Sequence, residues 1–266
     1  MRALVLSGGA SFGAYQAGVW KALEAHAWEP DVIIGVSIGC VNAFALSRGA
    51  SDDEMAYIWR DLPGELGGMA HSSSSLWKHL RLFRDWLDVV VERFGDRQPR
   101  CEMRAVLMEA PSLRFRMEDC LTDPRRYLEA ACALPGILAP VRVDGKWLID
   151  CGTTRHLPIR EALTLGATEI VAIDLLKHYP IPLARYARKK LLSVRDFLHG
   201  EHSEPSAEEL AQVSLTVVAH DGPLGAIPDA FRWNPVHVEQ LLRLGYEDGL
   251  RSLSATAPTG VVGQEY

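Results

Sequence analysis

A chain of 266 residues is long enough for one large domain with a substantial core, and its 48% hydrophobic and 23% charged residues are ordinary for a globular protein. The 34 acidic and 28 basic residues give a net charge of −6, which argues against general nucleic-acid binding. The five cysteines are scattered without CxxC spacing, which predicts reduced thiols in a cytoplasmic protein rather than a disulfide framework or a metal site.

The first forty residues hold the pattern strand, glycine loop, helix, strand. Residues 3–7 form a continuous apolar run, typical of a strand buried on both faces of a parallel sheet. Residues 14–26 have helical spacing, and Val32 begins a β-branched run. This order predicts a βαβ unit that opens a parallel, three-layer α/β domain. The N-terminal apolar run is too short for a signal peptide, and no run of about 18 apolar residues predicts a membrane span.

The elements that follow keep the α/β character. Helices are predicted over 38–47, 52–60, 76–94, 124–133, 159–165 and 235–253, and strands over 113–118, 141–143, 147–149, 169–174 and 215–219. Residues 63–75 are predicted as an irregular loop, and residues 255–266 as a flexible tail after a single domain of residues 1–254. The helix at 76–94 is interpreted as core-facing, with a lid over an acyl pocket as the alternative.

The most informative stretch is Gly35-Val36-Ser37-Ile38-Gly39, which follows a strand and precedes a helix. A nucleophile elbow needs this context, because the sharp turn pushes the Ser37 hydroxyl over the start of the helix, where backbone N–H groups favour negative charge. Gly35 and Gly39 leave room for strand and helix to approach. The alternative is a glycine-rich turn with an incidental serine.

A serine nucleophile needs a base, and two kinds of residue are candidates. Among the nine histidines, His220 and His237 are the best placed for a triad. Asp150 is better placed than either, because it ends a hairpin strand and is followed by Cys151 and Gly152, which let the backbone turn. A partly desolvated carboxylate has a raised pKa and can accept the serine proton. The alternative for Asp150 is a turn residue that caps a loop.

The loop Gly8-Gly9-Ala10-Ser11-Phe12-Gly13 has two interpretations. It lies between a strand and a helix, as in a dinucleotide-binding loop, but Ala10 stands at the second glycine of that motif and no acidic residue ends the second strand. Alternatively, its N–H groups point at an oxyanion. The elbow on the next strand favours the oxyanion interpretation, because it brings a nucleophile beside the loop.

These motifs, with Ala133-Leu134-Pro135-Gly136 and Asp150-Cys151-Gly152, resemble patatin-like phospholipases in type and order over roughly residues 2–175. The resemblance implies a three-layer α/β/α sandwich with a mostly parallel central sheet, and a Ser-Asp dyad in which Ser37 is the nucleophile and Asp150 the base. The oxyanion hole implied by position consists of the N–H groups of Gly8, Gly9, Ala10, Ser11 and Gly13.

The chain departs from the family pattern at Ala10, Phe12, Cys151 and His156. Phe12 replaces a family cation, which predicts a preference for neutral acyl esters over anionic phospholipids. If the cation instead holds the loop, Phe12 must do so by packing, for which the aromatic residues of the 76–94 helix are the expected partners.

The basic amphipathic stretch at 183–198 carries Arg185, Arg188, Lys189, Lys190 and Arg195. It is interpreted as an ordinary surface helix or as a peripheral contact with an anionic membrane. The predicted protein is therefore a cytoplasmic serine acyl hydrolase with a lipid or acyl-ester substrate, no cofactor and no nucleic-acid partner. The alternatives are a thioesterase or small-ester hydrolase with the same dyad, and a non-catalytic lipid-binding protein that kept the fold. Head group, chain length and oligomeric state stay open.

Overall fold

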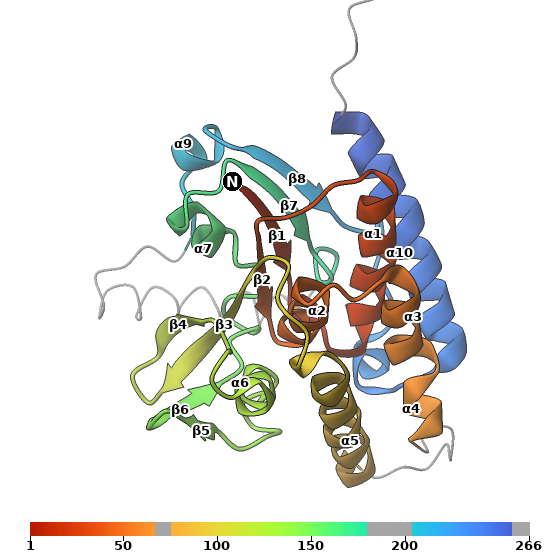
Figure 1. The fold of residues 1–266 in the computed structure, drawn as a ribbon, viewed down its shortest axis with the longest axis vertical. Coiled ribbons are helices and arrows are strands. Elements are labelled where there is room, and N and C mark those ends of the chain that lie inside the picture. The colour runs from red at the N-terminus through yellow and green to blue at the C-terminus, as the bar shows by residue number, and fades with distance from the viewer. Residues whose placement is uncertain (67–75, 180–203, 257–266) are drawn as a thin grey trace, which may run out of the picture.

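The computed structural model describes residues 1–66, 76–179 and 204–256, which contain one eight-stranded sheet (Figure 1). Its strands are β1 (Arg2–Leu6), β2 (Val32–Val36), β3 (Glu102–Ala110), β4 (Arg114–Glu118), β5 (Val141–Val143), β6 (Lys146–Ile149), β7 (Glu169–Ile173) and β8 (Ser214–Val218). They lie in the order β5-β6-β3-β2-β1-β7-β8, and β4 also pairs with β3. The strands β1, β2, β3, β7 and β8 run parallel, so the prediction of a mostly parallel sheet is confirmed.

Helices cover both faces of this sheet (Figure 1). The helices of the described residues are α1 (Gly13–Ala25), α2 (Ile38–Ser47), α3 (Asp52–Arg60), α4 (Leu62–Glu65), α5 (Leu76–Gly95), α6 (Pro124–Ala131), α7 (Ile159–Thr164), α9 (Ala207–Leu210) and α10 (Pro235–Thr256), with the 3-10 turns η1 (Ala10–Phe12) and η2 (Ile227–Phe231). No described helix combines the length and the apolar character needed to cross a bilayer.

The central strand β1 contributes to two apolar cores, one on each face. Leu4 and Leu6 pack in the core that α1, α2 and α10 cover, whereas Ala3 and Val5 pack in the core that includes α7. All four side chains are fully buried. Burial on both faces of the sheet therefore explains the uninterrupted apolar run of residues 3–6, because successive side chains of a strand point to opposite faces.

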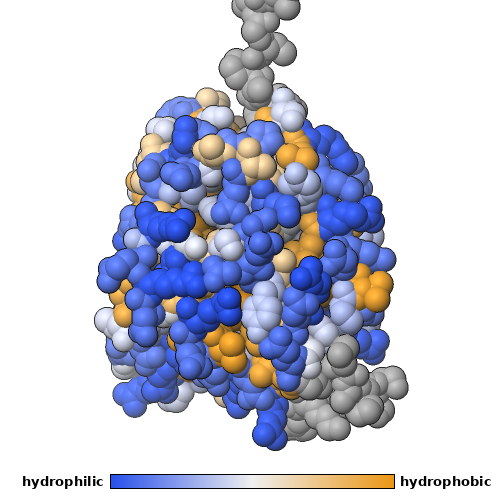
Figure 2. Space-filling view, turned by 45° about the vertical axis from the view of Figure 1, so that its right-hand side comes forward, coloured by the Kyte–Doolittle hydropathy of each residue, from blue (hydrophilic) through white to orange (hydrophobic). Residues whose placement is uncertain are grey.

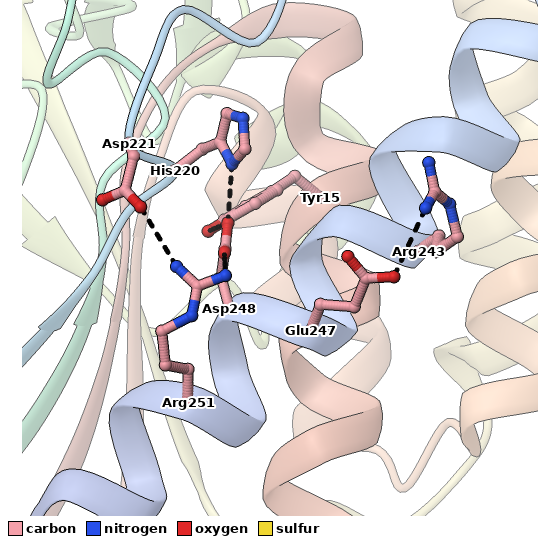
Figure 3. A network of polar contacts seen from close by, with 7 residues as sticks. All are labelled: Tyr15, His220, Asp221, Arg243, Glu247, Asp248 and Arg251. Atoms are coloured by element: carbon pink, nitrogen blue, oxygen red, sulfur yellow. Dashed lines mark hydrogen bonds and ion pairs between the residues drawn. The ribbon is translucent and has the colours of Figure 1, made fainter.

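The C-terminal helix α10 packs closely against α1. A Cβ atom added at Gly18 would lie 2.1 Å from the carbonyl oxygen of Leu242, and one added at Gly245 would lie 2.1 Å from that of Tyr15. Beside this contact the buried Asp248 accepts hydrogen bonds from the Tyr15 hydroxyl and from His220, both at 2.9 Å (Figure 3). The face turned forward in Figure 2 is largely hydrophilic, with apolar side chains gathered towards its lower part.

Most predicted elements lie within a few residues of those in the structure. The sequence analysis missed β3, whose charged Glu102, Arg104 and Glu109 interrupt its apolar run. This strand pairs with three others, since β2 lies along its first half and β4 and β6 join its second half. The start of the predicted loop at 63–75 is wrong, because α4 occupies residues 62–65. The basic stretch at 183–198 and most of the predicted tail lie outside the described residues.

Candidate active site

Ser37 lies at the turn between β2 and α2 in a backbone conformation that non-glycine residues rarely adopt, with φ 54° and ψ −127°. Such strain costs roughly 1–3 kcal/mol and is typical of functional turns. A Cβ atom at Gly35 would lie 2.4 Å from backbone atoms of Gly39, and one at Gly39 would lie 2.5 Å from the carbonyl oxygen of Leu6. Both glycines are therefore required for this strand and helix to meet at the serine.

Asp150 follows β6 and is 2% exposed. Its Oδ1 accepts a hydrogen bond of 2.6 Å from the Gly152 amide, and its own amide donates to the carbonyl oxygen of Ala133. Burial raises the pKa of Asp150 to about 6, while hydrogen bonding to Ser37 and to the Gly152 amide opposes this rise. The carboxyl group is thus held beside the serine with a proton affinity well above that of an ordinary aspartate.

The glycine loop meets the serine and the aspartate at one point. A Cβ atom at Gly8 would lie 3.2 Å from the Cβ atom of Ser37 and 3.6 Å from the Cα atom of Gly152. A Cβ atom at Gly152 would lie 3.0 Å from Asp150 Oδ1. A Cβ atom at either position would be in unusually tight contact with its neighbours, so the two glycines let the three segments approach closely.

Two of the five amides predicted for the oxyanion hole are occupied elsewhere. The Gly8 amide donates to the carbonyl oxygen of His156 at 3.0 Å, and the Gly13 amide donates into η1. The amides of Gly9, Ala10 and Ser11 donate no hydrogen bond to any residue that the structure describes. These three N–H groups at the start of η1 are the ones left to bind an anion.

Ser37 and Asp150 line a cavity of about 710 Å³. One part of the cavity wall is apolar. It is formed by α2, α3, α5, the segment that follows α6, and η2 with the residues just after it. Its apolar residues include Ile38, Trp59, Phe83, Trp86, Leu134, Ile137, Phe231 and Trp233. The interpretation of the 76–94 helix as core-facing is confirmed, because Leu87, Val90 and Phe94 are buried in the core. Trp86 also lines this cavity, and the lid alternative stays a prediction.

The cavity also has polar lining residues, namely Thr153, His156, Asp174 and Lys177. Burial raises the pKa of Asp174, but hydrogen bonding and charge from His156, the Leu176 amide and the Lys177 charge more than offset it, so the pKa is lowered overall. Asp174 is therefore ionised at neutral pH and places a negative charge at the cavity wall.

The patatin-like phospholipase model matches residues 4–163, which is more than half of the chain. The chain belongs to the patatin-like phospholipase family. It is 27% identical to lysophospholipase NTE1 of Eremothecium gossypii over 179 residues, which are 64% of this chain and 12% of that protein. It is 27% identical to lysophospholipase NTE1 of Saccharomyces cerevisiae over an alignment length of 192, and that alignment covers 64% of this chain and 10% of that protein. The chain thus spans about a tenth of the length of these relatives.

Among solved structures, VipD from Legionella pneumophila aligns with 96% of this chain and 67% of its own, with a TM-score of 0.53 and 12% identity. At this identity the likeness concerns the fold alone. The three-layer α/β arrangement with a central sheet is therefore shared with a known structure over nearly the whole chain.

The histidines that were weighed as triad members lie elsewhere in this patatin-like chain. His220 pairs with Asp248 of α10 (Figure 3), and His237 Nε2 lies 2.8 Å from the carbonyl oxygen of Leu224. Neither lines the cavity that holds Ser37. Phe12 is fully buried and stacks on Tyr179 at 5.6 Å, with His237 against its edge at 5.9 Å. Among the described side chains, the aromatic partners of Phe12 are therefore Tyr179 and His237 rather than residues of the 76–94 helix.

The polar lining was missed by the sequence analysis, although Asp174 carried a signal. It directly follows the parallel strand β7, and ligands in α/β sheets bind beyond the carboxyl ends of the strands. His156 was noted only as a departure from the family pattern, and its place at the cavity could not be predicted because a loop without regular structure carries it there. Within the described residues, no cluster of three or more His, Cys, Asp or Glu side chains is arranged to hold a metal ion.

Proposed function

We propose that this chain is a serine acyl hydrolase that cleaves lipid esters with Ser37 as nucleophile and Asp150 as base. The observation that carries the proposal is the strained Ser37 turn beside a buried carboxyl group with a pKa of about 6. A carboxylate of ordinary pKa is a weak base for a hydroxyl group, and burial strengthens it. The relatives named lysophospholipase support a lipid ester as the substrate.

In the proposed reaction, Ser37 Oγ attacks the ester carbonyl carbon while its proton passes to the Asp150 carboxylate. The carbonyl π electrons move to oxygen, and the N–H groups of Gly9, Ala10 and Ser11 stabilise this oxyanion. The intermediate collapses with loss of the alcohol, which takes its proton from Asp150. Water then attacks the acyl-enzyme with Asp150 again as base, and the fatty acid leaves as Ser37 is reprotonated.

The apolar and polar parts of the cavity wall favour one orientation of the substrate in the proposed reaction. The acyl chain lies along the apolar wall formed by Trp59, Phe83 and Trp86, because hydrocarbon gains most from leaving water there. The leaving alcohol faces His156 and Asp174. Asp174 and Lys177 place opposite charges on this polar wall, which suits neutral and zwitterionic acyl esters better than anionic ones.

The cavity wall includes apolar residues that are also exposed to solvent. Ile227 and Phe231 of η2 are 51% and 46% exposed, and both line the cavity. Apolar side chains at the entrance to a lipid-binding cavity lower their free energy by contacting a lipid surface. Peripheral contact with aggregated lipid through η2 is therefore part of the proposal.

The experiment is turnover of p-nitrophenyl butyrate and of a lysophospholipid by wild type and Ser37→Ala. Alanine fits the turn, so the variant should fold and lose hydrolysis of both substrates. Retained turnover in the purified variant would refute the nucleophile assignment. A thioester substrate measured in parallel shows whether a thioesterase is the better description, and absent turnover in wild type would leave a lipid-binding protein.

A further inference from the structure

A chain of buried hydrogen bonds connects α3 with the start of the glycine loop. Trp59 Nε1 donates to Asn42 Oδ1 at 3.0 Å. Asn42 Nδ2 donates to Gln16 Oε1 at 2.8 Å and to the carbonyl oxygen of Gly13 at 3.0 Å. Gln16 Nε2 donates to the carbonyl oxygen of Ser7 at 2.9 Å. Asn42 and Gln16 are fully buried, so water does not replace these bonds.

Two backbone carbonyl groups accept hydrogen bonds from this network, those of Ser7 and Gly13, and they flank the glycine loop. Ser7 directly precedes Gly8, and Gly13 directly follows η1. The loop between them carries the three amides that are free to bind an oxyanion. Ser7 is held a second time, because its hydroxyl oxygen accepts a hydrogen bond of 2.9 Å from the Leu175 amide. Both ends of the loop are therefore fixed by buried polar contacts.

The chain of hydrogen bonds also joins the loop to the nucleophile. Asn42 lies on α2, the helix that starts directly after Ser37, and Gln16 lies on α1, directly after the loop. One rigid helix thus carries both the serine turn and the amide that holds Gly13. A relative movement of Ser37 and the loop would break the bonds of Asn42.

We infer that Gln16 and Asn42 are positioning residues that hold the N–H groups of Gly9, Ala10 and Ser11 at the distance from Ser37 that the oxyanion requires. This inference rests on the proposed function, since only a hydrolase forms that oxyanion. Oxyanion donors act on the transition state, and small displacements of such groups have large effects on rate. Loss of either side-chain amide therefore lowers kcat and leaves ground-state binding nearly unchanged.

The test compares Gln16→Met and Asn42→Leu with Tyr15→Phe and Ser47→Ala. The first pair removes the amide groups at similar size. The second pair are matched controls on the same two helices, because each removes one buried hydroxyl hydrogen bond that does not reach the loop. All variants are assayed with p-nitrophenyl butyrate for kcat and KM, and their folding is checked by urea denaturation.

The expected result is a 10- to 100-fold lower kcat in Gln16→Met and Asn42→Leu, with KM within about twofold of wild type. The controls should keep kcat within about twofold at comparable stability. Should Asn42→Leu fail to fold, Gln16→Met decides alone, because it leaves the bond between Asn42 and Gly13 intact. A Gln16→Met enzyme with the kcat of the controls, or with a raised KM and unchanged kcat, would overturn the inference.

Failure of the proposed function would look different. A Ser37→Ala enzyme that still hydrolyses the ester would refute the nucleophile, whatever the Gln16 variant does. An inactive Ser37→Ala enzyme together with a fully active Gln16→Met enzyme would refute only the positioning role.

Discussion

Replacing Asp150 by asparagine should inactivate the protein and at the same time stabilise it at neutral pH. The pKa of this carboxyl group rises from 3.8 to about 6 because of burial. Between these two values the folded state binds more protons than the unfolded state, so stability falls as the pH rises through this window. With one pKa unit equal to about 1.4 kcal/mol, the ionised Asp150 costs roughly 3 kcal/mol at pH 8 and less than about 1 kcal/mol at pH 4.

Asparagine can accept the Gly152 hydrogen bond and needs no ionisation, so Asp150→Asn removes this cost. The free energy of unfolding is measured by urea denaturation at pH 4, 6 and 8 for wild type and variant. The variant should gain roughly 2–3 kcal/mol relative to wild type between pH 4 and pH 8. Asp96→Asn, at an exposed aspartate, is the matched control that removes a carboxylate without a burial cost.

The same variant should lose at least about a hundredfold in kcat, because an amide cannot take the serine proton. Activity and stability thus move in opposite directions. An Asp150→Asn protein whose stability relative to wild type does not depend on pH would show that the carboxylate is not buried as the structure has it. An active variant would show that Asp150 is not the base.

Three further predictions follow from the cavity. The value of kcat/KM for a neutral ester should rise about tenfold per pH unit below pH 6 and level off above it, because only ionised Asp150 accepts a proton; a flat stopped-flow profile from pH 4.5 to 8 would contradict this. Asp174→Asn should raise kcat/KM for lysophosphatidic acid relative to monoacylglycerol by roughly tenfold, and an unchanged ratio would exclude a head-group role. Phe231→Ser should reduce hydrolysis of a vesicle substrate far more than hydrolysis of a water-soluble ester. The control Trp147→Ser, at an exposed tryptophan outside the cavity, should not show this difference. If the two variants reduced hydrolysis of the vesicle substrate equally, lipid contact by η2 would be refuted.

The fold could be predicted where local pattern and burial agree. Residues 3–6 and 32–36 are apolar throughout because helices cover both faces of β1 and β2, and the glycines around Ser37 indicate a turn without reference to distant residues. The strand β3 was missed because charged residues interrupt its apolar run. Its position beside β2 depends on pairing with distant strands, which no local window records.

The sequence predicted that Ser37 and Asp150 lie together, which the structure shows, but it did not predict which amides of the glycine loop are free. The Gly8 amide is not free because it donates a hydrogen bond to the carbonyl oxygen of His156, a residue far along the chain. The environment of Phe12 likewise depends on Tyr179 and His237, which approach it only in the folded protein. Local sequence indicates which chemistry a segment carries, whereas long-range contacts decide which of its groups are free to act.

The central claim is that Ser37 carries the acyl group during turnover. The most direct measurement is mass spectrometry of the protein after reaction with a fluorophosphonate, with the modified peptide sequenced. The proposal predicts one adduct per chain, located on Ser37, with a rate that is strongly reduced in Asp150→Asn. An adduct on another residue, or an unmodified Ser37 in a protein that still hydrolyses esters, would contradict it.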